Sequence, residues 1–382
     1  MTGRKLLFLF ACLAVLPMWS QDAALSGQAS LFYTVQDGTD RFGWRYLPEL
    51  RAGLPLGDTY RFDLETAANA FGTGDGERPE ALWDDADIDP YRLWGRFSHP
   101  RWEVRVGLQK INFGAALLLR PLMWFDRIDP RDPQQITEGV DAVLGRYYFL
   151  NNGNIWAWGL YGNADPKGWE VFGNRDGSWE WGGRIQWPLG PGEIAATVHF
   201  RDGVLALPAP LSTDVVMPER RFGIDGKWDV GVGLWIESVF STRETPEPAG
   251  VSIPLPTRQT WTTVGMDWTV PWGNGLPVVA EHMVATVGTD DDFFFETVHA
   301  SALMADYSLG LLDRVQAIVF YDWEAQRWAR FLAWSRTWDR VQLYLNAFWN
   351  SEYGATLALT GGRESAFGAV SRGVQVQLIV NH

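Results

Sequence analysis

The sequence predicts an all-β protein, a transmembrane antiparallel β-barrel of about 16–18 strands, and three observations support this prediction. Long segments alternate between apolar and polar residues, and a period of two places side chains on opposite faces of a strand. Tryptophan is frequent, with 22 in 382 residues, and its ring favours the interface between membrane and water. The first 20 residues have the pattern of an export signal. A barrel in an outer membrane accounts for all three observations.

Residues 1–20 are expected to be a signal peptide. A basic start and an apolar core at residues 6–16 precede Pro17, and we expect cleavage after Ser20. The only cysteine, Cys12, lies inside this segment. The alternative of a lipoprotein acylated at this cysteine is disfavoured, because the apolar run continues beyond it. The mature chain, residues 21–382, is then expected to be a single outer-membrane β-barrel domain without a disulfide.

The composition excludes several classes of protein. Hydrophobic residues make up 46% and charged residues 20% of the chain, which argues against disorder. No stretch reaches the roughly 18–20 apolar residues of a membrane-spanning helix. The leader holds two of the 32 basic residues and none of the 46 acidic ones, so the mature net charge would be −16. This argues against nucleic acid as a partner and weakly favours cations, although acidic loops that only provide solubility are the simpler explanation. A Trp-rich soluble β-sandwich or carbohydrate-binding surface remains an alternative.

Strands are expected wherever the alternation is sustained between turn signals. In residues 179–187 the tryptophans share one face, whereas Glu180 and Arg184 share the other. By the same criterion strands are predicted at 27–36, 42–54, 58–71, 91–98, 101–109, 139–149, 153–162, 178–187, 191–202, 219–229, 230–240, 258–270, 276–288, 293–308, 311–322, 326–338, 339–350 and 371–381, with a further candidate at 353–361.

The connections between these strands differ in length. Turns at 188–192, 229–230 and 338–339 are short, whereas other connections are much longer. Such a difference is typical of membrane barrels, which have short periplasmic turns and long extracellular loops. The long connections are 72–90, 110–138, 163–177, 203–218 and 241–257.

The alternation also divides the side chains between a lipid face and a lumen. Apolar and aromatic residues are expected outside, namely Trp179, Trp181, Trp187, Val198, Phe200, Leu343, Leu345 and Trp349. Polar residues of the same strands are expected to line the lumen, namely Glu180, Arg184, Gln186, Glu193, His199, Arg201, Arg314, Gln316, Gln342 and Asn346. A barrel this wide leaves room for an aqueous channel unless loops fill it.

Residues 110–138 differ from the other connections. Their apolar part at 115–119 is expected to be a short helix, and three arginines then alternate with three aspartates among prolines. Proline lowers the entropy cost of ordering a loop, and Arg and Asp can pair bidentately, so we expect an ordered loop. One hypothesis is that it narrows the pore with opposed charges; the other is that it caps the barrel rim with charges paired among themselves. The candidates for a pore constriction are Arg120, Asp126, Arg127, Asp129, Arg131 and Asp132.

The acidic segment 75–89 is a weaker candidate for cation binding. The spacing of Asp85, Asp87 and Asp89 is similar to the start of an EF-hand loop. Pro90 stands where that loop needs glycine, which excludes an EF-hand. A loose divalent-cation site remains open, but a solvated extracellular loop explains the charges more simply.

No enzyme signature is present in the sequence. The patterns G-x-S-x-G, H-E-x-x-H and the P-loop are all missing. His199, on the expected lumen face, is interpreted as a lining residue rather than a base. A hydrolase with His199 or His282 at the rim stays open as a minor alternative, because such sites are built from dispersed residues. We expect no enzyme, no metal site and no cofactor.

These patterns together resemble Gram-negative porin-like outer-membrane β-barrels. The specific part is residues 119–161, where the run 119–133 precedes Leu-Gly-Arg-Tyr-Tyr-Phe at 144–149 and Trp-Ala-Trp-Gly-Leu-Tyr at 156–161. This stretch is similar to one in outer-membrane proteins without an assigned role. Many such barrels end in an aromatic residue that the assembly machinery reads, whereas this chain ends in His382. Either a looser signal is used or this histidine substitutes.

The resemblance implies a passive outer-membrane channel for small polar or ionic solutes. Selectivity would come from lumen charges and from the Arg/Asp-rich loop. A non-conducting scaffold or adhesin barrel is the main alternative. The expected partners are outer-membrane lipid, lipopolysaccharide and a small solute. Nothing in the pattern separates a subunit interface from a lipid face, so no oligomeric state is predicted.

Overall fold

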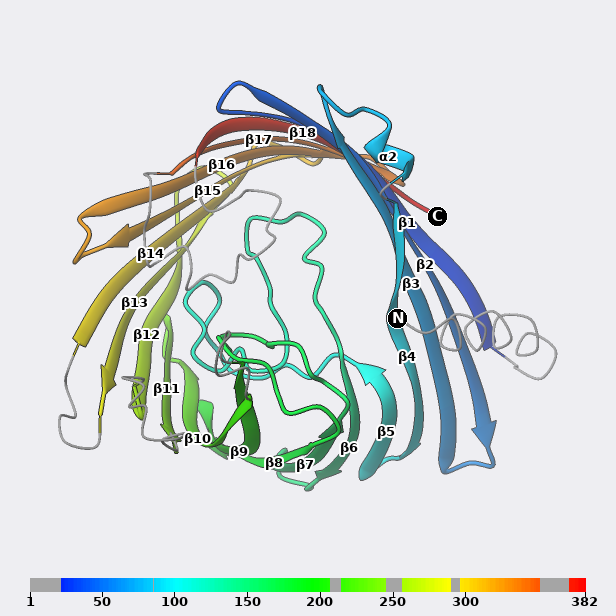
Figure 1. Cartoon of the computed structure of the whole chain (residues 1–382), viewed down its shortest axis with the longest axis vertical. Coiled ribbons are helices and arrows are strands. Elements are labelled where there is room, and N and C mark those ends of the chain that lie inside the picture. The colour runs from blue at the N-terminus through cyan, green and yellow to red at the C-terminus, as the bar shows by residue number, and fades with distance from the viewer. Residues whose placement is uncertain (1–21, 85, 207–213, 245–255, 290–295, 351–370) are drawn as a thin grey trace.

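The computed structural model describes residues 22–382 except residue 85 and segments 207–213, 245–255, 290–295 and 351–370. The predicted signal peptide and the candidate strand at 353–361 lie outside the described residues. Elsewhere the chain forms one 18-stranded antiparallel sheet that closes on itself, so the predicted barrel is confirmed at the upper strand count (Figure 1). Among the described residues no helix is long and apolar enough to cross a membrane.

The strands follow one another around the barrel in chain order. Their bounds are β1 Asp22–Gln36, β2 Thr39–Leu56, β3 Tyr60–Asp75, β4 Asp87–His99, β5 Trp102–Gln109, β6 Val140–Tyr148, β7 Asn154–Tyr161, β8 Trp179–Leu189, β9 Gly192–Ala206, β10 Asp214–Asp229, β11 Gly233–Arg243, β12 Arg258–Val270, β13 Leu276–Gly288, β14 Glu296–Ser308, β15 Asp313–Asp322, β16 Arg327–Thr337, β17 Val341–Asn350 and β18 Ser371–Asn381. One short helix, α2 (Ala81–Asp84), lies in the connection between β3 and β4.

The barrel closes where β1 pairs with β18. The register runs from Gln28 opposite Asn381 to Gln36 opposite Gly373. The terminal His382 continues this seam, because it exchanges two backbone hydrogen bonds of 3.0 Å with Gly27. Each of the 18 described strands is thus paired on both sides, as a sheet in hydrocarbon requires.

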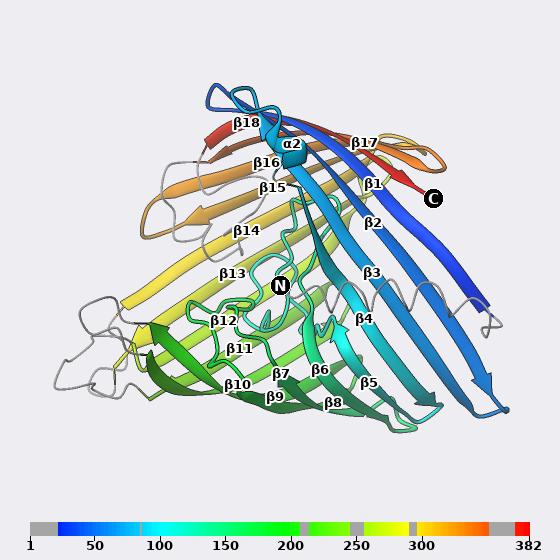
Figure 2. The ribbon, with the colours of Figure 1, turned by 45° about the vertical axis from the view of Figure 1, so that its right-hand side comes forward.

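The two ends of the barrel differ in their connections. Both chain termini of the described barrel lie at the end with the short turns, such as the turn between β8 and β9. The longer connections, including those after β3, β5, β7 and β11, lie at the other end. A division into short turns at one end and long connections at the other is typical of membrane barrels. Figure 2 shows β1–β4 running side by side between these two ends.

Two long connections fold into the barrel instead of standing on its rim (Figure 1). We call residues 110–139, between β5 and β6, the first inner loop, and residues 162–178, between β7 and β8, the second inner loop. The short helix expected at 115–119 is wrong, because the loop has no helix there. The backbone N–H groups of residues 116–119 donate to carboxylates of the barrel wall, which replace the carbonyl acceptors of a helix.

Candidate functional site: a pore constriction

Two wall carboxylates hold the first inner loop by its backbone. Glu281 of β13 accepts hydrogen bonds of 2.5–3.0 Å from the N–H groups of residues 117–119, and one of 3.2 Å from Trp235 Nε1. Glu237 of β11 accepts from the N–H groups of Ala116 (2.7 Å) and Leu122 (3.2 Å). Buried N–H groups that leave water need an acceptor, so these contacts fix the backbone position of the loop. We call Glu237 and Glu281 the carboxylate clamp.

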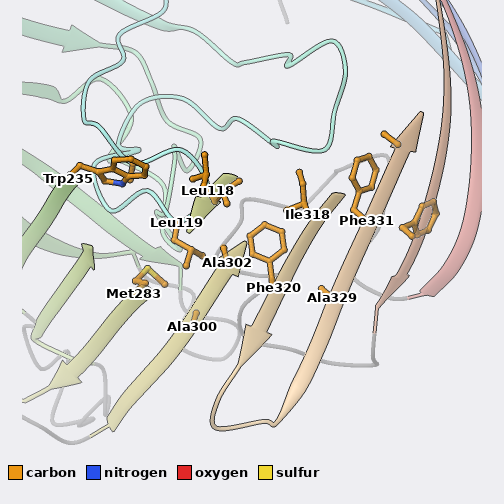
Figure 3. Close-up of a cluster of buried hydrophobic side chains, with 14 residues drawn as sticks. Leu118, Leu119, Trp235, Met283, Ala300, Ala302, Ile318, Phe320, Ala329 and Phe331 are labelled. Carbon is orange, nitrogen blue, oxygen red and sulfur yellow. The ribbon is translucent and has the colours of Figure 1, made fainter. Parts of the chain in front are cut away.

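The same part of the loop packs on an apolar section of the lumen wall. Leu118 and Leu119 join a buried cluster with Ala302, Ile318 and Phe320 (Figure 3). The inward faces of β13–β17 supply most of this cluster. The sequence pattern predicts a polar lumen. The wall under the loop is apolar instead, so only part of the lumen is polar.

Aromatic rings bind the base of the loop to β7 and β9. Phe113 stacks on Trp158 with ring centroids 5.7 Å apart, and Phe125 meets His199 edge-on at 4.9 Å. Trp124 contacts Phe113 at 5.6 Å, also edge-on. Such aromatic pairs add stability beyond their buried area.

The far part of the loop reaches the opposite wall. Gln134 donates to Gln28 of β1 at 2.7 Å and accepts from Gln377 of β18 at 3.1 Å. Thr137 accepts from Arg92 of β4 at 2.7 Å. The strands β1 and β18 lie across the closed sheet from β11 and β13, so the loop crosses the lumen.

Three charges of the predicted constriction are buried, namely Arg120, Asp126 and Arg131. Arg120 donates to Asn112, and its own carbonyl accepts from Trp169 Nε1 of the second inner loop at 2.6 Å. The Asp126 carboxylate lies 3.8 Å from Lys110 Nζ. Burial raises the pKa of Asp126 and lowers the pKa of Lys110, because removal from water disfavours the charged form of each group.

The remaining predicted charges pair within the loops. Arg131 and Asp129 form a bidentate ion pair with both contacts at 2.8 Å. Asp132 accepts from the Gln134 N–H at 2.9 Å, and burial raises its pKa. Arg127 donates to the carbonyls of Gly168 (2.9 Å) and Pro166 (3.2 Å), which joins the two inner loops.

The second inner loop is held by ion pairs. Glu170 of this loop bridges Arg201 at 2.9 Å and Arg221 at 3.0 Å, and all three side chains are buried. Both arginines also contact Glu219 of β10, at 2.7 and 2.9 Å. Lys167 joins the network through Glu170 at 3.4 Å and links it to Glu180 at 3.0 Å.

Four of the predicted lumen residues belong to this buried wall. Glu180 and Arg201 lie in the network, and His199 Nε2 is 3.1 Å from the Glu180 carboxylate. Arg184 forms a bidentate pair with Asp225 of β10, with contacts of 2.5 and 2.8 Å. These side chains face inward but are covered, so they hold the inner loops rather than line open space.

The other predicted lumen residues have smaller networks. Each lies on the inward side of its strand, opposite exposed apolar neighbours such as Leu345 and Trp349. Their contacts are Gln186 to Glu193 at 2.6 Å, Arg314 and Gln316 to Asp306, Gln342 to Tyr344 at 3.2 Å, and Asn346 to Gln375 at 3.1 Å.

An open cavity of about 780 Å³ remains beside β1–β5. It is the part of the lumen near the end with short turns, and charged side chains of both signs line it. Its charged lining residues are Asp22, Arg51, Arg61, Asp63, Glu65, Arg96 and Arg105. Several of them pair, for example Arg96 with Asp63 at 2.8 Å.

Sequence reasoning missed the residues that position the inner loops. Glu281 is the charged residue on an otherwise apolar inward face of β13, and Glu237 lies between the inward Trp235 and Val239 of β11. That pattern was a usable signal, because an isolated carboxylate on a buried face needs a partner. Glu170 carried no such signal, since its strand partners are far away in sequence.

The other candidate sites are less developed. In the acidic segment, Asp75 accepts from the N–H groups of Glu77 and Arg78, and within the described residues no three His, Cys, Asp or Glu side chains gather as a metal site. His282 lies on the outward side of β13, with Nδ1 2.9 Å from Ser301 Oγ.

Comparisons with known proteins show the fold. No protein-family model and no curated protein sequence matches the chain. Among solved structures it is similar to OccAB1 from Acinetobacter baumannii, with a TM-score of 0.59, 11% identity, and coverage of 95% of this chain and 97% of that one. It is also similar to OccK3 (OpdO) from Pseudomonas aeruginosa (TM-score 0.55, 14% identity, 96% and 97% covered). A third is the anion-selective porin from Comamonas acidovorans (TM-score 0.52, 12% identity, 94% and 99% covered).

The predicted resemblance to Gram-negative porin-like barrels is therefore confirmed at the level of fold. A closed barrel with an apolar outer face supports an outer-membrane location.

Proposed function

We propose that this protein is a passive outer-membrane channel for small polar or ionic solutes, narrowed by residues 110–138. The observation that carries the proposal is the path of the first inner loop, which crosses the lumen from the carboxylate clamp to Gln134 on the opposite wall. The lumen beside β1–β5 stays open and charged. The mechanism is diffusion through this remaining space.

The charges that solutes would meet are mostly paired. Asp129 and Arg131 neutralise each other, and Arg127 is tied to carbonyl oxygens of the second inner loop. We infer that these residues select solutes by shape and local dipole rather than by a strong net field. The charged lining near the short-turn end, with Arg51, Arg96 and Arg105, would supply the remaining selectivity.

A non-conducting scaffold is the main competing function. The apolar and aromatic packing of the first inner loop supports it, because a tightly packed loop can plug a barrel. A hydrolase has one supporting contact, that of His282 with Ser301 on the outer face.

The constriction is tested by measuring ion preference. The full mature chain is placed in a planar bilayer under a salt gradient, and the reversal potential is compared between wild type and the double variant Arg127→Ala, Arg131→Ala. The expected result is a shift toward cation preference, because two positive charges leave the narrow part of the lumen. Arg101→Ala, in the exposed turn between β4 and β5, serves as the control and should leave the potential unchanged. Unchanged conductance and reversal potential in the double variant would remove the constriction from the proposal.

A further inference from the structure

A row of two arginines flanking a tryptophan crosses the outer face of β16, β17 and β18. The register places Arg330 directly opposite Trp349, and Trp349 directly opposite Arg372. All three side chains are exposed, and they alternate with buried residues of the same strands such as Phe348 and Gln375. Neighbouring strands lie about 4.8 Å apart, so the two arginines stand roughly 10 Å apart with the indole between them.

We infer that the row lies at the level of the lipid headgroups. It is close to the ends of these strands that lie opposite the chain termini, beside the turn between β15 and β16. Tyr321 and Trp328 flank this turn with ring centroids 4.5 Å apart, and Trp328 is 45% exposed. Outward aromatic residues form girdles at the membrane interface, so they mark this height on the barrel.

The two guanidinium groups have no carboxylate partner among the described residues. Arg330 Cζ lies 5.5 Å from the centroid of the Trp328 ring, a cation–π contact. The Asp37 carboxylate accepts from the backbone N–H of Arg372 at 3.2 Å, not from its guanidinium. Glu324, in the nearby turn, likewise accepts from a backbone N–H, that of His299 at 2.7 Å. These carboxylates are thus already hydrogen-bonded to the backbone.

Another outward arginine shows the contrast. Arg220 of β10 also lies toward the long-connection end, but it pairs with Glu244 at 3.2 Å. A paired arginine is locally neutral and offers less to an anion. Among the described residues, Arg330 and Arg372 therefore differ from Arg220 in having no ion pair with a carboxylate.

We propose that Arg330, Trp349 and Arg372 form a binding site for the phosphate groups of a phosphorylated glycolipid in the outer leaflet. Guanidinium groups bind phosphate bidentately, and anionic headgroups are recognised by clustered basic residues at the membrane surface. The indole between the arginines supplies an apolar platform at the boundary between headgroup and acyl chains. The site faces the membrane and is separate from the lumen, so it does not depend on channel activity.

The test measures lipid binding to the full mature chain folded in detergent, by native mass spectrometry. The probes are diphosphorylated lipid A, the same lipid after removal of both phosphates, and inorganic phosphate. Wild type should bind the phosphorylated lipid roughly tenfold or more tightly than the dephosphorylated one. The double variant Arg330→Ala, Arg372→Ala should lose this preference, whereas Arg220→Ala should keep it.

Heat-modifiable gel mobility confirms that each variant is folded. If the double variant fails to fold, the comparison of the two lipids on wild type and on each single variant still decides. Equal binding of both lipids by wild type, or an unchanged preference in the folded variants, would overturn the proposal. Inorganic phosphate that competes as well as the lipid would also overturn it, because the assigned ligand is the lipid headgroup.

Discussion

The two inner loops are held to the barrel wall in different ways. The wall holds the first loop by accepting hydrogen bonds from its backbone, at Glu237 and Glu281. It holds the second through side chains, where Glu170 bridges Arg201 and Arg221. A backbone contact fixes the path of the loop whatever side chains it carries, whereas an ion-pair network depends on particular residues of the loop. The first loop can therefore vary its charges without losing its position across the lumen.

Removing the carboxylate clamp should have the largest effect. In the double variant Glu237→Ala, Glu281→Ala, five N–H groups of the loop lose their acceptors, four of them buried. Each orphaned group costs about 1–3 kcal/mol, so the loop should leave the wall. Single-channel conductance should rise severalfold and become noisy. Glu77→Ala, in the exposed connection before α2, is the control. A folded double variant with wild-type conductance would show that the clamp does not position the loop.

Breaking the ion-pair network should mainly lower stability. Glu170→Ala leaves Arg201 and Arg221 short of a buried counter-charge, which costs about 3–5 kcal/mol. The temperature at which the barrel loses its heat-modifiable mobility should fall, and Asp165→Ala, at an exposed site of the same loop, should not change it. Since the clamp remains, conductance should change less than in the first variant. The reverse order of conductance effects would contradict the proposed division of roles.

The contact between the two loops can be tested at a glycine. A Cβ on Gly168, whose φ is +48°, would collide with the Met123 carbonyl oxygen of the first loop. Gly168→Ala should therefore push the loops apart and weaken the Arg127 hydrogen bond, with a cost of about 1–3 kcal/mol. Gly162→Ala is a matched control, because Gly162 also has a positive φ (+78°) but has open space around it. If both variants change conductance equally, backbone strain and not the loop contact is responsible.

The smallest expected effect concerns pH. Burial raises the pKa of Asp126, so the folded protein keeps this proton to a higher pH than the unfolded chain. The contribution of Asp126 to stability is therefore largest below its unfolded pKa, falls as pH rises toward the folded pKa, and is constant above that. Asp126→Asn should remove this pH dependence. The unfolding temperature of the variant should therefore increase relative to that of wild type as pH rises, by no more than about 2 °C. A gain that grows as pH falls would have the wrong sign.

The fold could be predicted closely from the sequence, whereas the site could be predicted only in part. Strands such as 179–187 could be predicted, because a shift of one residue in register would turn the tryptophans inward and the charged side chains toward lipid. Residues 110–138 were recognised as an ordered loop, and the Asp129–Arg131 pair agrees with the expected Arg–Asp pairing. The predicted helix at 115–119 is wrong, because the backbone N–H groups there donate to wall carboxylates and not to carbonyl groups of a helix. Those contacts are invisible in the loop itself, since any residue except proline offers the same N–H.

The second inner loop shows what else could not be predicted. Residues 163–177 were expected only to form a long connection, yet Glu170 lies buried among arginines of β9 and β10. Lone acidic residues in a polar loop are normally solvated, so only the folded path reveals this role. The lumen residues Glu180, His199 and Arg201 lie inward, but the loop covers them.

The central claim is that the crossing loop leaves a conducting path. We would reconstitute residues 21–382 in a planar bilayer and record single-channel currents under a salt gradient, after heat-modifiable mobility has confirmed the folded barrel. Discrete ohmic steps with a defined reversal potential are the predicted result. A folded barrel that never conducts would contradict the account and favour a plugged scaffold.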